Sequence, residues 1–173
     1  MIAAATAEHP IVCKLLAEGT LTSAGLASMR RESEIIGLPL VEVLQLNDLI
    51  SEAGIAQAYA DSSGLRFLDL TRRPPTRAWV LTVPENVARR KNCLIFGEVS
   101  GELVAVVADP IDPSVRAALQ ARFERPIQYV VSPRYQILEV INDVYGTARA
   151  QGARLTSGAP LATAVATASA TGL

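Results

Sequence analysis

Two aspartates stand where an apolar run ends, in the stretch VVADPIDPS at residues 106–114. Two carboxylates this close together could hold a metal ion or act as an acid and a base. The same residues could instead shape a turn, because Pro110 disfavours a helical backbone at Asp109, and Asp112 precedes Pro113 at the N-cap position of a helix. A metal site needs a third protein ligand, and none is visible in the sequence. We therefore expect Asp109 and Asp112 to be structural caps.

Other sequence signatures of catalysis are missing. The chain contains no GxxxxGK[ST], GxGxxG, GxSxG or HExxH pattern, which removes the main support for an ATPase, dehydrogenase, hydrolase or zinc-protease activity within it. His9, Cys13 and Cys93 form no CxxC or Cys/His group, so neither a zinc site nor a disulfide framework is indicated. Cys93 begins an apolar run, as expected of a small buried side chain. We expect no catalytic residue, cofactor or metal in this chain.

Charge and hydropathy restrict the possible partners. The formal net charge is -1, which gives no reason to expect nucleic acid as a partner. The opening MIAAATAEHP lacks the features of a signal peptide, and no stretch reaches the roughly 18 uninterrupted apolar residues of a membrane span. We expect a cytoplasmic protein that inserts into no membrane and reaches one only through a partner.

Short clusters of basic residues are the remaining candidates for a binding function. Their simplest interpretation is solvated surface, and the alternative is salt bridges with an acidic partner or contact with a phosphate. We take five of these residues as candidate partner-binding positions: Arg30, Arg31, Arg89, Arg90 and Lys91.

An internal repeat organises the first third of the chain. PIVCKLLAEGTLTSAGLA (10–27) and PLVEVLQLNDLISEAGIA (39–56) align at an offset of 29 residues. Each copy predicts a short helix that begins with proline, a tight turn, and a second helix with a hydroxyl N-cap, Thr22 or Ser23 in one copy and Ser51 in the other. The pattern predicts two stacked helical hairpins. Gly25 and Gly54 fall inside the second helices, where close helix approach would explain them.

A sheet with covering helices is predicted after the repeat. Ser100-Gly101 links two apolar strands, as in a two-residue hairpin, and 127–131 supplies a third strand. Residues 65–70 are a candidate edge strand. One helix should begin at Pro113, and another at Pro133 with Ser132 as its N-cap, ending at Gly146. We expect a small, three-stranded, mainly antiparallel sheet packed with two to three helices.

The chain therefore divides into three predicted segments of an α+β protein. Residues 1–62 form the helical-hairpin subdomain and 63–146 the small α/β subdomain. Residues 147–173 are rich in Ala, Thr, Ser and Gly, as in a linker or tail.

The order of these parts resembles the N-terminal domains of type II secretion and type IV pilus assembly ATPases, the MshE-N-like family. The motifs that carry the resemblance are Leu15 with Gly19 and Leu21-Thr22, GLRFLDL (64–70), VPENVARR (83–90), LVAVVADPID (103–112) and DVYG (143–146). The resemblance covers about residues 10–146. It implies a non-catalytic adaptor domain that precedes an ATPase core and docks on the cytoplasmic domain of an inner-membrane platform protein.

Two alternatives follow from the same resemblance. One branch of the family binds cyclic di-GMP through an RLG start and a glutamine near the end of each repeat, and here Pro10 and Pro39 occupy the starting positions. Asp48 also replaces the turn glycine of the second copy, so the sequence departs from that binding pattern. The same module type is also attached to membrane glycosyltransferases.

Overall fold

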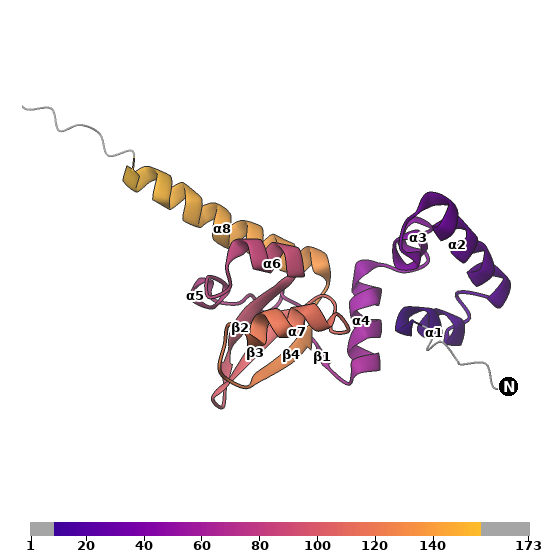
Figure 1. The fold of residues 1–173 in the computed structure, drawn as a ribbon, viewed down its shortest axis with the longest axis horizontal. Coiled ribbons are helices and arrows are strands. Elements are labelled where there is room, and N and C mark those ends of the chain that lie inside the picture. The colour runs from indigo at the N-terminus through magenta and orange to yellow at the C-terminus, as the bar shows by residue number, and fades with distance from the viewer. Residues whose placement is uncertain (1–8, 157–173) are drawn as a thin grey trace, which may run out of the picture.

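The computed structural model describes residues 9–156 of the 173-residue chain. Within these residues the chain forms eight helices and four strands. In chain order they are α1 (Pro10–Ala17), α2 (Ser23–Ile36), α3 (Leu40–Leu46), α4 (Glu52–Ser63), β1 (Arg66–Phe67), α5 (Arg77–Val80), α6 (Glu85–Lys91), β2 (Cys93–Val99), β3 (Glu102–Val107), α7 (Pro113–Gln120), β4 (Ile127–Val131) and α8 (Arg134–Thr156). The predicted α+β class is confirmed: a helical part, α1–α4, precedes a sheet with helices packed around it (Figure 1).

The helix caps of the two repeat copies are equivalent. The hydroxyl of Thr22 accepts the backbone N–H of Gly25 at 3.1 Å, and that of Ser51 accepts the N–H of Gly54 at 3.1 Å. The expectation that the two glycines allow close helix approach is wrong. A Cβ at Gly54 would lie 2.9 Å from Cγ1 of Ile50, which precedes the helix. The glycines leave room for the segment that enters each helix.

The turns before the caps and the packing of the helices also follow the repeat. Gly19 (φ 71°) and Asp48 (φ 54°), at equivalent positions, both adopt the left-handed backbone conformation. That conformation costs a side-chain-bearing residue roughly 1 kcal/mol, and aspartate is among those that tolerate it best. The most extensive contacts run between the copies, since α1 packs against α4 and α2 against α3. The two copies therefore depend on each other for their core.

The sheet corrects our prediction of three mainly antiparallel strands. In the described residues it has four strands in the order β1-β4-β3-β2. β2 pairs antiparallel with β3, whereas β4 pairs parallel with both β3 and β1. The helix α7 connects β3 to β4, and such a helical crossover brings the chain back to start the next strand in the same direction. The additional strand, β1, is the edge strand expected within residues 65–70.

The hairpin and the helices that cover the sheet follow the predicted pattern. Ser100 (φ 53°) and Gly101 (φ 86°) both have positive φ, as the two-residue link between β2 and β3 requires. All of β3 after its first residue is buried, as expected of an inner strand. The predicted apolar faces of the two covering helices contribute Val115 and Leu119 from α7 and Ile137, Ile141 and Val144 from α8.

The last helix is longer than predicted. α8 continues past Gly146 and ends at Thr156, so glycine does not terminate it. Gly146 keeps a negative φ, and alanine, arginine and glutamine follow it in 147–156, all of which favour helix. The beginning of the predicted tail is therefore helical, and 157–173 lie outside the described residues. In Figure 1, α8 extends away from the sheet on the side opposite the helical part.

The strand β4 joins the helical part to the sheet. Val131, its last residue, is fully buried and belongs to the hydrophobic core of the helical part, together with Ile11 and Leu44. The helix α4 packs directly against β1 and β4. The two parts thus share a buried apolar contact.

Candidate interaction surfaces

The two aspartates of the opening motif direct their carboxylates to their own backbone. Asp109 Oδ1 accepts the N–H of Ile111 at 2.8 Å and that of Asp112 at 3.3 Å, and Asp112 Oδ1 accepts the N–H of Ser114 at 2.8 Å. Hydrogen bonds from the side chain and backbone of Ser114 hold the pKa of Asp112 below its usual value. Among residues 9–156, no three His, Cys, Asp or Glu side chains are placed to hold a metal ion. Both acids shape the turn between β3 and α7, as predicted.

Ser132, predicted to be the N-cap of the last helix, has a different partner. Its N–H donates to the carbonyl of Val107 at 3.2 Å, and its hydroxyl donates to Oε1 of Gln136 at 3.2 Å. The amide of Tyr135, in the first turn of α8, donates instead to Oε2 of Glu52 at 2.9 Å. Ser132 remains bound to the neighbouring strand, so the cap of α8 comes from α4 in the helical part.

The basic residues at the end of α6 mostly make contacts within the molecule. Arg89 Nη1 donates to Oδ1 of Asn142 in α8 at 2.6 Å, and Lys91 Nζ donates to Oγ of Ser114 in α7 at 2.5 Å. These two side chains hold α6 against its neighbouring helices. Arg90 is the exposed member of the group.

Arg30 and Arg31 are both exposed on α2. The same helix carries Ile35, which is 84% exposed, and α3 carries Leu46, which is 67% exposed. Those two are the most exposed large apolar side chains within residues 9–148, for which side-chain exposure is described. We refer to Arg30, Arg31, Ile35, Ile36 and Leu46 as the α2–α3 surface.

The internal repeat relates Arg30 and Arg31 of α2 to two positions in α4. At the offset of 29 residues, Arg30 and Arg31 align with Tyr59 and Ala60 of α4. Tyr59 is 7% exposed and Ala60 is 1% exposed, in a helix that packs against α1, β1 and β4. Positions that are interior in α4 are therefore exposed and positively charged in α2.

A cavity of about 370 Å³ lies where the helical part meets the sheet. Its wall includes His9, Tyr59, Asn92, Asp109 and Arg134. His9 Nε2 and the Tyr59 hydroxyl lie 3.3 Å apart, whereas His9 Nδ1 and Asn92 Oδ1 are buried with no hydrogen-bond partner in the described part of the chain. Burial, together with the nearby Asp109 carboxylate, raises the pKa of Tyr59 to about 12. We refer to this hollow as the junction cavity.

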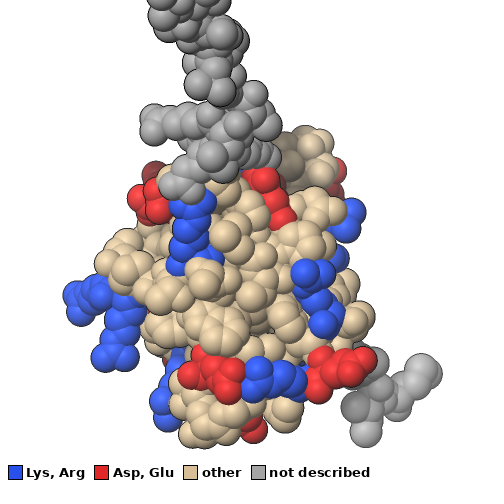
Figure 2. All heavy atoms as spheres, turned by 90° about the vertical axis from the view of Figure 1, so that its left-hand side faces the viewer, with Lys and Arg blue, Asp and Glu red and all other residues tan. Residues whose placement is uncertain are grey.

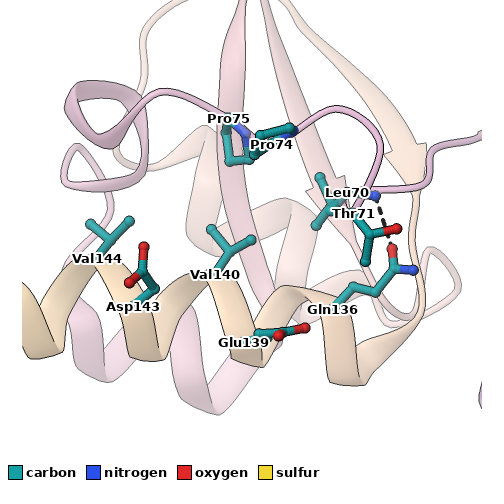
Figure 3. Close-up of a pocket in the computed structure, with 9 residues that line it drawn as sticks. All are labelled: Leu70, Thr71, Pro74, Pro75, Gln136, Glu139, Val140, Asp143 and Val144. Carbon is teal, nitrogen blue, oxygen red and sulfur yellow. Dashed lines mark hydrogen bonds between the residues drawn. The ribbon is translucent and has the colours of Figure 1, made fainter.

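A second hollow, of about 450 Å³, runs between α8 and the connection that follows β1 (Figure 3). Val140 and Val144 point from α8 toward Pro74 and Pro75 on the opposite side. We refer to this hollow as the α8 groove, and its full lining is Leu70, Thr71, Pro74, Pro75, Gln136, Glu139, Val140, Asp143 and Val144.

Gln136 fixes one wall of the α8 groove. Its side chain is buried, its Oε1 accepts the backbone N–H of Leu70 at 2.9 Å, and its Nε2 donates to Oδ1 of Asp69 at 3.0 Å. Hydrogen bonds from Thr71 and from Gln136, with the nearby Arg72 charge, hold the pKa of Asp69 below its usual value. A buried network therefore ties the connection after β1 to α8.

Sequence reasoning missed both Gln136 and His9. Gln136 is a polar residue in the first turn of α8 and directly follows the exposed Arg134 and Tyr135, so only the tertiary structure shows that it is buried. His9 stands beside a proline near the N-terminus and forms no recognisable motif with the cysteines. A proline-started helix directly after His9 was visible in the sequence, and it was the one signal that this histidine would be ordered.

Cys93 is poorly suited to act as a nucleophile. Burial raises the pKa of the Cys93 thiol to about 11, so its reactive thiolate is disfavoured.

Figure 2 shows basic and acidic side chains interspersed on one face of the molecule. Among the residues described, no helix is both long enough and apolar enough to span a bilayer.

Comparison with known families and structures identifies the fold. Residues 63–151 match the MshEN domain. A structure of MshE with cdg (cyclic di-GMP) is similar with a TM-score of 0.68 at 24% identity, over 78% of this chain and 98% of that one. Two structures of the N-terminal domain of XpsE are also similar. One gives a TM-score of 0.62 at 27% identity, over 77% of this chain and 92% of that one, and the other a TM-score of 0.51 at 26% identity, over 79% and 95%. The search of curated proteins gave no match.

These findings confirm the resemblance seen in the sequence. The fold is that of the N-terminal domains of type II secretion and pilus assembly ATPases, which are regulatory domains and not catalytic ones. The chain belongs to the MshEN domain family.

Proposed function

We propose that this chain is a docking domain that recruits a secretion or pilus ATPase to the cytoplasmic domain of an inner-membrane platform protein. The proposal includes an ATPase core in the parent chain and a location in the cytoplasm, peripheral to the inner membrane through the partner. Membership of the MshEN family supports the assignment to a secretion ATPase. A membrane glycosyltransferase as the parent chain is the alternative, which the sequence downstream of residue 173 would distinguish.

The observation that carries the proposal is the contrast between α2 and α4. In α4 the positions of Tyr59 and Ala60 are interior, whereas the equivalent Arg30 and Arg31 of α2 are exposed beside the exposed apolar Ile35. Apolar side chains flanked by arginine are characteristic of protein interfaces, and arginine provides forked hydrogen bonds to carboxylates. The α2–α3 surface therefore suits an acidic patch on the platform protein.

Isothermal titration calorimetry with the purified cytoplasmic domain of the platform protein tests this proposal. We expect the chain to bind, and the double variant Arg30→Glu with Arg31→Glu to bind at least about tenfold more weakly, because two attractive charge pairs become repulsive. The matched control is Arg72→Glu with Arg73→Glu, which makes the same charge change at another exposed pair and should leave affinity nearly unchanged. Failure of the folded wild-type chain to bind would overturn the proposal.

Cyclic di-GMP binding at the junction cavity is a second candidate function. The favouring observation is the cavity itself, which combines the two unpartnered buried atoms of His9 and Asn92 with the guanidinium of Arg134, a group suited to a phosphate. Pro39, at the start of the second repeat copy, also lines it, in place of the arginine of the binding pattern. A thermal-shift titration with cyclic di-GMP should raise the midpoint in the wild type and in Arg90→Glu, but not in Arg134→Glu. An unchanged wild-type midpoint at high ligand concentration would remove this candidate.

A further inference from the structure

No residue that lines the α8 groove belongs to the α2–α3 surface or lines the junction cavity, although α8 also contributes Arg134 to the wall of that cavity. We propose that it binds a short cationic segment of another protein, one that presents an apolar side chain flanked by lysine or arginine. This interaction does not depend on docking through the α2–α3 surface.

The groove offers an apolar site for one such side chain. Leu70 and Val144 are buried residues of its lining, and Pro74, Pro75 and Val140 add accessible apolar surface. Figure 3 shows the two valines of α8 facing the prolines across the hollow. An aliphatic side chain placed there would be removed from water on several sides.

The charged side chains that line the groove are both acidic. Glu139 and Asp143 are exposed, lie four residues apart on α8, and therefore project from the same side of the helix. The lining contains these two carboxylates and no lysine or arginine. On the connection that forms the opposite wall, Arg72 Nε lies 3.4 Å from Oδ2 of Asp69. Two carboxylates flanking an apolar hollow favour a cationic ligand.

The groove is preorganised for such a ligand. Gln136 fixes the backbone of Leu70 from across the groove, and Pro74 and Pro75 restrict the connection that forms the opposite wall. A wall that is already ordered loses little conformational entropy when a peptide binds. This supports a binding role over a surface irregularity.

Charge excludes the two end segments of this sequence as the occupant of the groove. Residues 1–8 and 157–173, which lie outside the described structure, contain no lysine or arginine. Neither segment can therefore provide the cationic flanks that Glu139 and Asp143 favour.

Two six-residue probe peptides test the proposal by NMR titration of the ¹⁵N-labelled chain. The cationic probe is Gly-Lys-Leu-Leu-Lys-Gly, and the acidic probe replaces both lysines with glutamate. We expect the cationic probe to shift the amide signals of Thr71, Gln136, Val140 and Val144, in a manner weakened by salt, and the acidic probe to leave them in place. If the cationic probe leaves these signals in place, or if the acidic probe shifts them equally, the proposal is wrong.

Charge-reversal variants distinguish a specific site from bulk charge. Glu139→Lys with Asp143→Lys should weaken binding of the cationic probe about fivefold or more and create binding of the acidic one. The matched control, Glu34→Lys with Glu124→Lys, makes the same net charge change at exposed positions elsewhere and should bind the cationic probe as the wild type does. Equal weakening in both double variants would overturn the proposal. Loss of platform-protein binding in the calorimetric experiment would not affect this outcome, so the two proposals fail separately.

Discussion

The helices α2 and α4 occupy equivalent places in the repeat but have different surroundings. Both begin with a hydroxyl cap that accepts the amide of a glycine three residues later. α4 buries Ala56, Ala58, Tyr59 and Ala60, whereas Leu26 is the one buried residue of α2. The difference arises because α4 packs against the sheet and α2 does not share that neighbour.

This contrast shows how a duplicated motif can provide both a buried core and an exposed, charged surface. The helix pattern of each copy requires only a narrow apolar stripe, so other positions are free to vary. In the copy next to the sheet those positions became small or aromatic. In the outer copy they are arginines, and both arginine side chains are exposed.

Exchange of residues between the two repeat copies should have the largest effect on the free energy of unfolding. Ala60→Arg places the residue of α2 in the interior position of α4, and we expect it to lower the free energy of unfolding by about 3 kcal/mol or more, because a charge without a partner must be buried in a filled space. The reverse change, Arg31→Ala, should alter it by less than about 0.5 kcal/mol. Urea denaturation measures both. A stability of Ala60→Arg close to that of the wild type would show that the two helices are less different than the structure indicates.

A smaller effect is expected at Tyr59, the interior counterpart of Arg30. Tyr59→Phe removes the hydroxyl that lies 3.3 Å from His9 Nε2 and should reduce stability by about 1 kcal/mol at neutral pH. The pKa of Tyr59 is raised from 10.0 to about 12 in the folded state. The contribution of un-ionised Tyr59 to the free energy of unfolding is present below pH 10. It is lost as the pH rises toward 12, because Tyr59 ionises first in the unfolded chain.

Denaturation of the wild type and of Tyr59→Phe over this alkaline range measures the effect. The wild type should lose more stability than the variant as the pH rises from 10 toward 12. Parallel pH profiles of the two proteins would contradict the assigned environment of Tyr59.

Removal of the helix caps should change stability least, and it compares α2 and α4 directly. Ser51→Ala and Thr22→Ala each remove one side-chain hydrogen bond to a glycine amide, worth about 1 kcal/mol. We expect Ser51→Ala to lower the stability of the whole protein, since α4 is part of the contact with the sheet. Thr22→Ala should mainly accelerate hydrogen exchange at the start of α2, since α2 is a peripheral helix. Equal global losses would show that α2 and α4 unfold as one unit.

Local features of the fold could be predicted from the sequence because their causes are local. The two hydroxyl caps, the hairpin at Ser100-Gly101 and the turn formed by Asp109 and Asp112 each depend on side chains a few residues apart. The antiparallel pairing of β2 with β3 was predicted correctly, whereas the parallel pairing of β4 was not, although the helix between β3 and β4 was predicted. The same helix would have indicated parallel pairing had the crossover been considered.

The candidate sites were less predictable. Arg30 and Arg31 were identified from their type alone, whereas the internal partners of Arg89 and Lys91 come from residues 53 and 23 positions away in sequence. The α8 groove has walls from residues 70–75 and 136–144, and its key buried glutamine resembles any exposed helical glutamine in the sequence. No local pattern brings such distant segments together.

The sequence by itself determined the repeat, the caps, the turns and the family of this protein, because backbone preferences and short-range hydrogen bonds act between neighbours along the chain. The tertiary structure alone decided which copy of the repeat faces the sheet, which basic side chains remain exposed, and where the two hollows form. Those outcomes depend on apolar burial between distant segments, which is non-directional and leaves no fixed spacing in the sequence.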